Sequence, residues 1–197
     1  MKKILPLKRF KSIEDSFNES ILINEDEILM DQVKLNYIYD GIPNFIVNDL
    51  DPLTGKMSAF YNDVQFPNYD DCEDYASLYD KGINNLFTKK LDEELGYGTK
   101  ILELGCGTGQ LSLFLSRSNR DIFAVDISNS SLKLGEDFRQ RNEINNVFFM
   151  KMDVFDLKFN QNTFDCVVSN GVLHHTKNAE EAFKCLVEVT KPKGILV

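Results

Sequence analysis

The sequence predicts an α/β fold in which helices cover both faces of a parallel β-sheet. From Thr99 onward, short apolar runs typical of buried strands alternate with longer amphipathic stretches typical of helices. A glycine-rich turn joins the first of these strands to the first helix, and glycine permits the tight turn that a βαβ unit needs there. Consecutive buried strands joined by helices pair in parallel through right-handed crossovers, which gives a doubly wound sheet.

The second half of the chain contains five predicted strands and three predicted helices. Ser128 and Asn129 are both suited to cap the second helix, and Pro192 and Gly194 end the third. The predicted strands cover residues 100–104, 121–125, 146–150, 164–168 and 195–197, and the predicted helices cover residues 110–118, 128–142 and 178–190.

Residues 1–98 lack this alternation. We divide them into an irregular, accessory N-terminal extension over residues 1–65 and a helical lid or cap segment over residues 66–98. In the lid segment, apolar side chains recur at helical spacing between residues 74 and 87. Residues 99–197 then form the core domain.

Composition and charge limit the possible partners. The chain has 22 basic and 31 acidic side chains, a formal net charge of −9, so we expect no nucleic-acid partner. The basic segment over residues 1–11 is interpreted as a solvated terminus. No apolar run approaches the roughly 18–20 residues that span a bilayer, and the N-terminus lacks the apolar region of a secretory signal. We therefore expect a cytoplasmic protein with no membrane partner; the sequence does not predict its oligomeric state.

Gly105, Gly107 and Gly109 follow the first predicted core strand at alternate positions. Without a Cβ, the backbone can approach a ligand closely. The dinucleotide fingerprint G-x-G-x-x-G needs its third glycine at position 110, which is Gln110 here. The G-x-G-x-G spacing therefore disfavours a dinucleotide cofactor.

Two acidic residues follow the next two strands. Asp126 lies 17 residues after Gly109, close to the roughly 20-residue spacing of a carboxylate that accepts ribose hydroxyls. Asp153 follows the third strand, where it can accept a hydrogen bond from an adenine amine. Each acid alone is also compatible with an ordinary strand-end residue. Their joint placement at successive strand ends favours a ligand site, because parallel strands end at one edge of the sheet.

Six short motifs carry a family resemblance. They are residues 101–109 (ILELGCGTG), 125–128 (VDIS), 152–154 (MDV), 164–168 (FDCVV), 171–175 (GVLHH) and 186–196 (LVEVTKPKGIL). In these motifs the chain resembles class I S-adenosylmethionine-dependent methyltransferases, especially the group that includes the quinone-biosynthesis C-methyltransferases. The resemblance covers about half of the chain and implies a Rossmann-like sheet, S-adenosylmethionine as cofactor and methyl transfer to an acceptor that the sequence does not identify. The acidic charge balance favours a small-molecule acceptor over a nucleic acid.

The resemblance also implies a cofactor site. The glycines would line the methionine and ribose portions, Glu103 would reach the amino group and Asp126 would hold the ribose hydroxyls. The complete set of implied cofactor-binding residues is Glu103, Gly105, Cys106, Gly107, Gly109, Asp126, Ile127, Asp153, Val154 and Asn170.

His174 and His175 are the candidate catalytic residues. Histidine is the side chain whose unperturbed pKa lies near neutral pH, so either residue is suited to remove a proton from an acidic carbon or a phenol. In the resembling family this paired position often begins a helix and shapes the site without taking part in catalysis. Tyr75 and Tyr79 are compatible either with a lid over the cofactor or with an apolar packing stripe.

Two features outside these motifs lead to further expectations. Residues 37–46 are similar to the tail of small zinc-ribbon proteins that partner methyltransferases, but the zinc-binding cysteine pairs are absent upstream, so we predict no metal. The N-terminal segment is interpreted either as a degenerate accessory segment or as a substrate-side cap. The family's sheet has seven strands and this chain supplies five. We therefore expect it to be C-terminally incomplete, with an exposed apolar edge at its fifth strand.

Two alternative functions remain open at this point. A nicotinamide-dependent oxidoreductase can use a similar sheet but requires the other glycine spacing. A non-catalytic S-adenosylmethionine-binding regulatory domain would carry the same anchor residues.

Overall fold

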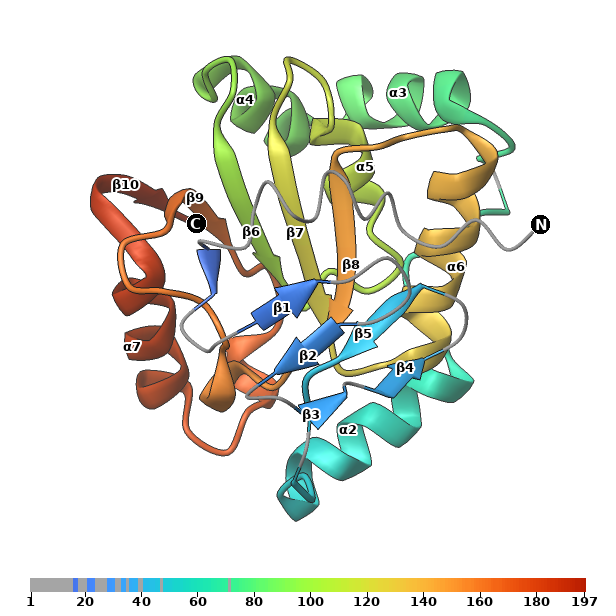
Figure 1. The fold of residues 1–197 in the computed structure, drawn as a ribbon. Helices are drawn as coiled ribbons and strands as arrows, with labels where there is room; N and C mark the ends of the chain where they lie inside the picture. The colour runs from blue at the N-terminus through green and yellow to red at the C-terminus, as the bar shows by residue number, and fades with distance from the viewer. Residues whose placement is uncertain are drawn as a thin grey trace.

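The computed structural model describes residues 16–17, 21–23, 28–30, 33–34, 36–38, 41–46, 48–70 and 72–197. The basic segment over residues 1–11 lies outside these residues. The centre of the molecule is a seven-stranded sheet with the strand order β10-β9-β6-β7-β8-β5-β4 (Figure 1). In the described part of the chain, no helix is both long and apolar enough to cross a bilayer.

All five predicted core strands are present and pair in parallel. The first strand, β6, lies in the middle of this sheet between β7 and β9, which is the strand order of a doubly wound fold. The predicted fold class is therefore confirmed. The core strands are β6 (Lys100–Leu104), β7 (Asp121–Asp126), β8 (Val147–Lys151), β9 (Phe164–Val168) and β10 (Thr190–Leu196).

The three predicted core helices are also present. Ser128 caps α6, because its Oγ accepts the N–H of Ser131 (3.2 Å). Between β8 and β9 the chain forms only a short 3-10 turn, η2, and a second turn, η3, follows β9. The bounds of these elements are α5 (Gln110–Leu115), α6 (Asn129–Arg141), η2 (Val154–Asp156), η3 (Leu173–His175) and α7 (Ala179–Val189).

The last strand begins five residues earlier than predicted. We expected Pro192 and Gly194 to separate α7 from a strand over residues 195–197, whereas β10 begins at Thr190. Its register against β9 shifts between Thr190 and Ile195. That irregularity accommodates the proline, which cannot donate to the ladder and occurs in sheets at edges or bulges. In the described residues β10 is an edge strand, and Ile195 on it is exposed, as expected.

The N-terminal extension is more regular than predicted. Strands β4 (Asn36–Ile38) and β5 (Ile42–Asn44) form an antiparallel hairpin that extends the main sheet beyond β8. The Phe45 N–H donates to the Lys151 carbonyl oxygen (2.9 Å). Strands β1 (Ile21–Ile23), β2 (Ile28–Met30) and β3 (Val33–Lys34) form a separate antiparallel sheet. The expected irregular structure is thus corrected, because runs of two or three residues are too short to show a period in the sequence.

The lid segment and the residues before it contain three helices: α2 (Pro52–Asp63), α3 (Tyr75–Asn84) and α4 (Leu86–Glu94). The apolar spacing between residues 74 and 87 spans a break at Asn85. The Asn85 side chain accepts the Thr88 N–H (3.1 Å) and so starts α4. Tyr79 stacks on Phe114 of α5 (ring centroids 5.5 Å apart). Of the two open interpretations for this tyrosine, the structure favours packing.

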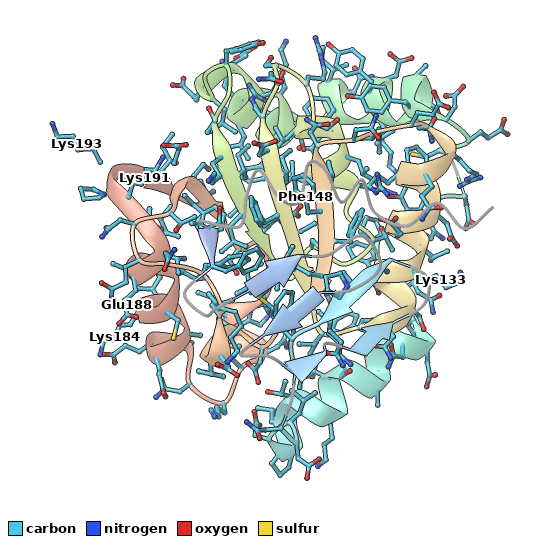
Figure 2. All side chains as sticks on the ribbon, viewed as in Figure 1. Lys133, Phe148, Lys184, Glu188, Lys191 and Lys193 are labelled. Atoms are coloured by element: carbon cyan, nitrogen blue, oxygen red, sulfur yellow. The ribbon has the colours of Figure 1, made fainter. Side chains whose placement is uncertain are left out.

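The sheet separates two apolar layers. On one face, side chains from β6–β9 pack against α3, α4, α5 and α6. On the other face, Phe123 and Phe148 pack with α7 and with Phe17 and Phe45 from the N-terminal extension. Figure 2 shows Phe148 inside the molecule, whereas Lys184 and Glu188 project outward from α7. Phe17 and Phe45 of the N-terminal extension therefore belong to the hydrophobic core on this face of the sheet.

Candidate functional site

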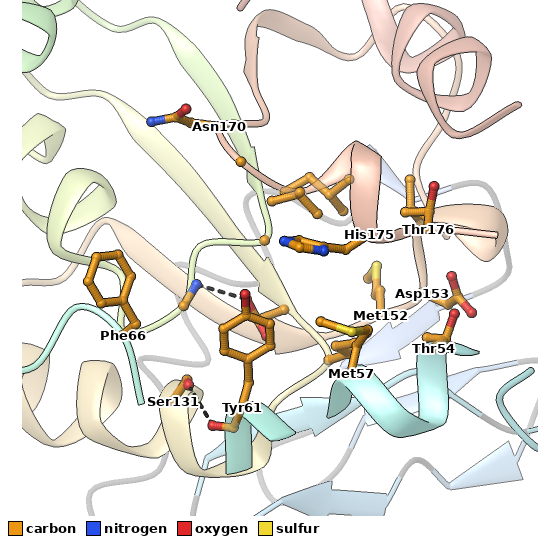
Figure 3. A pocket seen from close by; sticks show the side chains of 18 residues that line it. Thr54, Met57, Tyr61, Phe66, Ser131, Met152, Asp153, Asn170, His175 and Thr176 are labelled. Carbon is orange, nitrogen blue, oxygen red and sulfur yellow. Dashed lines mark hydrogen bonds between the residues drawn. The ribbon is translucent and has the colours of Figure 1, made fainter. Parts of the chain in front are cut away.

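A cavity of about 350 Å³ opens where the core strands end. Its walls come from the turns after β6, β7 and β8, from the loop after β9 and from α2, and Figure 3 shows these side chains around one space. The lining residues are Thr54, Met57, Tyr61, Phe66, Leu104, Gly105, Gly107, Asp126, Ile127, Ser131, Met152, Asp153, Val154, Asn170, Gly171, Val172, His175 and Thr176.

Backbone N–H groups of the turn after β6 hold it in place, mainly through hydrogen bonds to the end of β7. The N–H groups of Gly105 and Cys106 both donate to the Val125 carbonyl oxygen (2.7 and 3.0 Å), and the Gly109 N–H donates to the Cys106 carbonyl oxygen (2.8 Å). The Gly107 N–H donates to the Asp126 carboxylate (2.8 Å). These N–H groups are thus already paired within the protein and are not available to a pyrophosphate.

The glycines of this turn are also required by close packing. Gly107 has a φ of +55°, and a Cβ there would lie 2.2 Å from the Phe66 carbonyl oxygen. A Cβ on Gly105, with a φ of +70°, would lie 2.2 Å from a methyl group of Val172. The turn after β6 therefore touches both the segment after α2 and the loop after β9.

Asp126 connects the end of β7 to this turn. Its two carboxylate oxygens accept the N–H groups of Gly107 and Ser128 (2.8 Å each). Burial raises the pKa of Asp126, although these two hydrogen bonds act in the opposite direction. The side chain is half-buried and lines the cavity. Its carboxylate is therefore fixed in orientation at the edge of the ligand space.

Asp153 occupies the corresponding position after β8. One carboxylate oxygen accepts the Phe155 N–H (3.0 Å), which caps the short turn η2. Burial raises the pKa of Asp153, and the nearby carboxylate of Asp51 adds to the effect. In Figure 3, Asp153 lies beside Thr54 of α2 and near Met152. The cavity thus has two carboxylates at successive strand ends, as the sequence predicts.

Of the predicted site residues, eight line the cavity and four do not. The eight are Gly105, Gly107, Asp126, Ile127, Asp153, Val154, Asn170 and His175. Gly109 instead packs against Phe149 and precedes α5. Cys106 is buried, and His174 is exposed outside the lining. The imidazole of His175 points into the cavity (Figure 3).

Glu103 is the fourth residue outside the lining. The Ser112 hydroxyl of α5 donates to its carboxylate (2.5 Å), and burial raises the pKa of Glu103 to about 7. A carboxyl group of this kind is protonated in a large fraction of molecules at neutral pH. Its predicted contact with a cofactor amino group stays a prediction.

A substrate-side cap was one interpretation of the N-terminal segment, but the helix α2 and its position at the cavity were not predicted from the sequence. Thr54, Met57 and Tyr61 of α2 line the cavity, although residues 1–65 were expected to be accessory. Phe66, from the predicted lid segment, lines it as well. The available signal was Asp51-Pro52, since an Asp N-cap followed by proline starts a helix. It could not indicate which surface the helix would contact.

Hydrogen bonds anchor α2 to the turn after β7. The Ser58 hydroxyl donates to the Ile127 carbonyl oxygen (3.0 Å), and the Ser128 hydroxyl donates to the Tyr61 carbonyl oxygen (3.0 Å). The segment after α2 is anchored to the glycine turn, because the Tyr69 hydroxyl donates to the Thr108 carbonyl oxygen (2.8 Å). Both ends of this wall are thus fixed to the turns that carry the candidate site.

Comparison with known proteins gives a family match for the second half of the chain. Residues 102–197 match the family described as "Methyltransferase domain". The ubiquinone/menaquinone biosynthesis C-methyltransferase UbiE of Blochmanniella pennsylvanica is 37% identical over 108 residues, which are 53% of this chain and 42% of that protein. The chain spans about half the length of the curated relatives that it matches.

Two solved structures share the fold. A putative S-adenosyl-L-methionine-dependent methyltransferase from Methanococcus maripaludis aligns with a TM-score of 0.54 at 17% identity, covering 76% of this chain and 66% of that one. The [4+2]-cyclase SpnF aligns with a TM-score of 0.60 at 22% identity, covering 75% of this chain and 60% of that one. Because a cyclase and a methyltransferase both align, these likenesses concern the fold alone.

We predict that Gly107→Ala destabilises the protein and that Gly55→Ala stabilises it. Alanine at position 107 would adopt a left-handed conformation, which costs about 1–2 kcal/mol, and would displace Phe66. Gly55 lies within α2, and a Cβ added there would meet no other atom within 4 Å, so alanine should add about 0.5–1 kcal/mol. Chemical denaturation measures both changes. Equal effects of the two substitutions would contradict the packing described for the glycine turn.

We also predict a pH-dependent stability effect of Glu103→Gln. The folded state holds the Glu103 proton up to a pKa of about 7, whereas the unfolded chain releases it near pH 4.5. The free energy of unfolding of the parent therefore falls as pH rises between these values. Glutamine keeps an acceptor for Ser112 and carries no charge, so the variant should gain stability relative to the parent between pH 5 and pH 8, by up to about 3 kcal/mol. Denaturation curves at both pH values measure this, and a difference independent of pH would refute it.

Proposed function

We propose that the chain transfers a methyl group from S-adenosylmethionine to a small-molecule acceptor, since residues 102–197 match the methyltransferase domain family and the fold is similar to that of a putative S-adenosyl-L-methionine-dependent methyltransferase. The observation that carries this proposal is the cavity with two carboxylates, Asp126 and Asp153, beside a glycine turn in which the N–H groups of Gly105, Cys106, Gly107 and Gly109 are already paired. A cation and ribose hydroxyls suit such a site, whereas a pyrophosphate would face two carboxylates.

The cofactor supplies an activated methyl group on a sulfonium. The leaving group is S-adenosylhomocysteine, in which the sulfur is an uncharged thioether. In our proposal the carboxylate of Asp126 accepts the ribose hydroxyls, with its orientation set by the Gly107 and Ser128 N–H groups. Asp153 and Val154 bind the hydrogen-bonding edge of adenine, and Ile127 packs on the adenine face. Gly105, Gly107 and the backbone near Asn170 border the methionine end. The predicted contacts of Cys106 and Gly109 stay predictions.

Positioning and exclusion of water are the main tasks of this chain in an in-line displacement. We propose that α2 supplies the exclusion, since Thr54, Met57 and Tyr61 cover the strand ends from the solvent side. His175 is the candidate base for an acceptor that must lose a proton, because its ring points into the cavity. His174 does not line the cavity, although its ring lies against that of His175 (ring centroids 3.9 Å apart).

The name of one relative and the charge of this chain support a proposal for the acceptor. The name of the relative from Blochmanniella pennsylvanica describes ubiquinone and menaquinone biosynthesis, and the acidic balance of this chain favours small molecules over nucleic acids. We therefore propose a small carbon acid or phenol as the acceptor.

Calorimetric titration tests cofactor binding. We predict that S-adenosylmethionine and S-adenosylhomocysteine bind and that NAD does not. Asp126→Ala should weaken binding of both sulfur compounds by about 1.5–3 kcal/mol, because charge-assisted hydrogen bonds to ribose are lost. Asp137→Ala, on the exposed face of α6, is the matched control and should change nothing. Binding of NAD in place of the sulfur compounds would refute the proposed function.

A methyl-transfer screen against phenols and 1,3-dicarbonyl compounds tests the role of His175. We predict that His175→Gln lowers the rate at least tenfold, while the affinity for S-adenosylhomocysteine stays within twofold. His174→Gln is the control and should keep the parent rate. Equal effects of the two substitutions would remove His175 from the reaction, and no transfer to any acceptor would favour a regulatory binding domain.

A further inference from the structure

Three segments of the chain meet at the end of the cavity where Asp153 lies. They are the start of α2, the turn η2 that Asp153 caps, and the loop between η3 and α7. Thr54, Asp153 and Thr176 line the cavity, one from each segment. Figure 3 shows these three side chains together at one side of the ligand space. The geometry of this end of the cavity therefore depends on how the three segments are held to one another.

Two carboxylates lie near each other at this point. Asp51 caps α2 by accepting the N–H groups of Leu53 and Thr54 (3.1 and 3.2 Å), and Asp153 caps η2 by accepting the Phe155 N–H (3.0 Å). Burial raises the pKa of Asp153, and the negative charge of Asp51 raises it further. Both effects favour the protonated form of Asp153, which is the weaker acceptor for an adenine amine.

Lys177 brings a cation to these two carboxylates. Its ammonium lies 4.4 Å from the centroid of the Phe155 ring, and Phe155 is the residue whose N–H binds Asp153. The positive charge acts against burial and against Asp51 in its effect on the pKa of Asp153. The cavity lining, which lies within the described part of the chain, contains no Lys or Arg. Lys177 therefore offsets negative charge from just outside the ligand space.

The position of Lys177 in the chain also links two walls of the cavity. Lys177 directly follows His175 and Thr176, which both line the cavity. The Thr176 N–H and hydroxyl both donate to the Leu173 carbonyl oxygen (3.1 and 2.7 Å), and these bonds fix the chain direction at this point. The contact between the Lys177 ammonium and the Phe155 ring then joins the loop after η3 to η2.

We propose that Lys177 is a positioning residue of the cofactor site. Its ammonium keeps the Asp153 carboxylate charged and holds η2 against the loop after η3, so an adenine amine meets an acceptor of fixed orientation. Lys177 does not line the cavity and acts on the ligand through Asp153. This inference rests on the proposed function, because it concerns the residue that binds the adenine edge in the same site.

A charge series at position 177 tests this role. Binding of S-adenosylhomocysteine to the full chain would be measured by calorimetry in about 10 mM salt, where charges are weakly screened. Lys177→Arg should stay within twofold of the parent, Lys177→Met should bind about three- to fivefold more weakly, and Lys177→Glu should bind at least tenfold more weakly. In about 1 M salt the loss in Lys177→Met should fall below twofold. Lys184→Met, which removes an exposed lysine of α7, is the matched control and should change nothing.

A second substitution shows whether Lys177 acts through Asp153. Asp153→Asn keeps an oxygen that accepts the Phe155 N–H and removes the negative charge. The substitution should itself weaken binding of S-adenosylhomocysteine, because the hydrogen bond to the adenine amine is no longer charge-assisted. In the Asp153→Asn background, Lys177→Met should cause less than a twofold further loss.

The pH dependence of binding provides a readout that a purely structural role of Lys177 would not change. Without the Lys177 charge the pKa of Asp153 is higher, so Asp153 is protonated sooner as pH falls. The ratio of the parent affinity to the Lys177→Met affinity should therefore increase from pH 8 to pH 5. The other ionisable groups around Asp153 are common to both proteins; they are Asp51, Asp156, His175 and Cys185.

Four results would overturn the proposal: affinities that do not follow the charge at position 177, a loss that persists in 1 M salt, a full Lys177→Met loss in the Asp153→Asn background, or an affinity ratio that does not change with pH. The third result would mean that Lys177 contacts the ligand directly or acts on the fold alone. Failure of the parent to bind S-adenosylhomocysteine is seen before any variant is compared, and it would refute the proposed function together with this assignment.

Discussion

The hydrogen bond between the Gly107 N–H and the Asp126 carboxylate joins the two strand ends on which the site depends. It spans from the turn after β6 to the end of β7, and the same carboxylate also holds the Ser128 N–H at the start of α6. A half-buried carboxylate with two backbone donors has a fixed orientation, although burial raises its pKa. The position of the glycine turn, the start of α6 and the edge of the cavity are thus determined together.

The N-terminal half is built onto this arrangement. Helix α2 contacts the turn that follows Asp126 through Ser58 and Ser128, and the Phe66 carbonyl oxygen lies against Gly107. On the opposite face of the sheet, Phe17 stacks on Phe45 (ring centroids 5.5 Å apart) and meets Phe123 at 6.4 Å. The connection between β8 and β9 has only the turn η2, so it brings no long helix to that face. Residues from before the family domain therefore complete both the core and the ligand cavity.

The walls of the cavity come from two parts of the chain. The proposed cofactor contacts come from strand ends within residues 102–197, whereas α2 and Phe66, which precede this domain, form another wall. A helix outside the family domain can change while the strand ends that carry the carboxylates stay the same. The same physical logic explains why proteins with different chemistry share the fold.

The sequence by itself determined the core. Apolar runs of five residues between helical stretches predicted β6 to β9, because buried parallel strands need continuous apolar side chains. The spacing of Gly105, Gly107 and Asp126 predicted a site at one edge, since strand order alone brings their backbones together. Only the tertiary structure decided the rest. The pairing of β5 with β8 and the position of α2 over the cavity depend on contacts such as Phe45 with Lys151 and Ser58 with Ile127. These contacts join residues far apart in the chain, and no local period of the sequence records them.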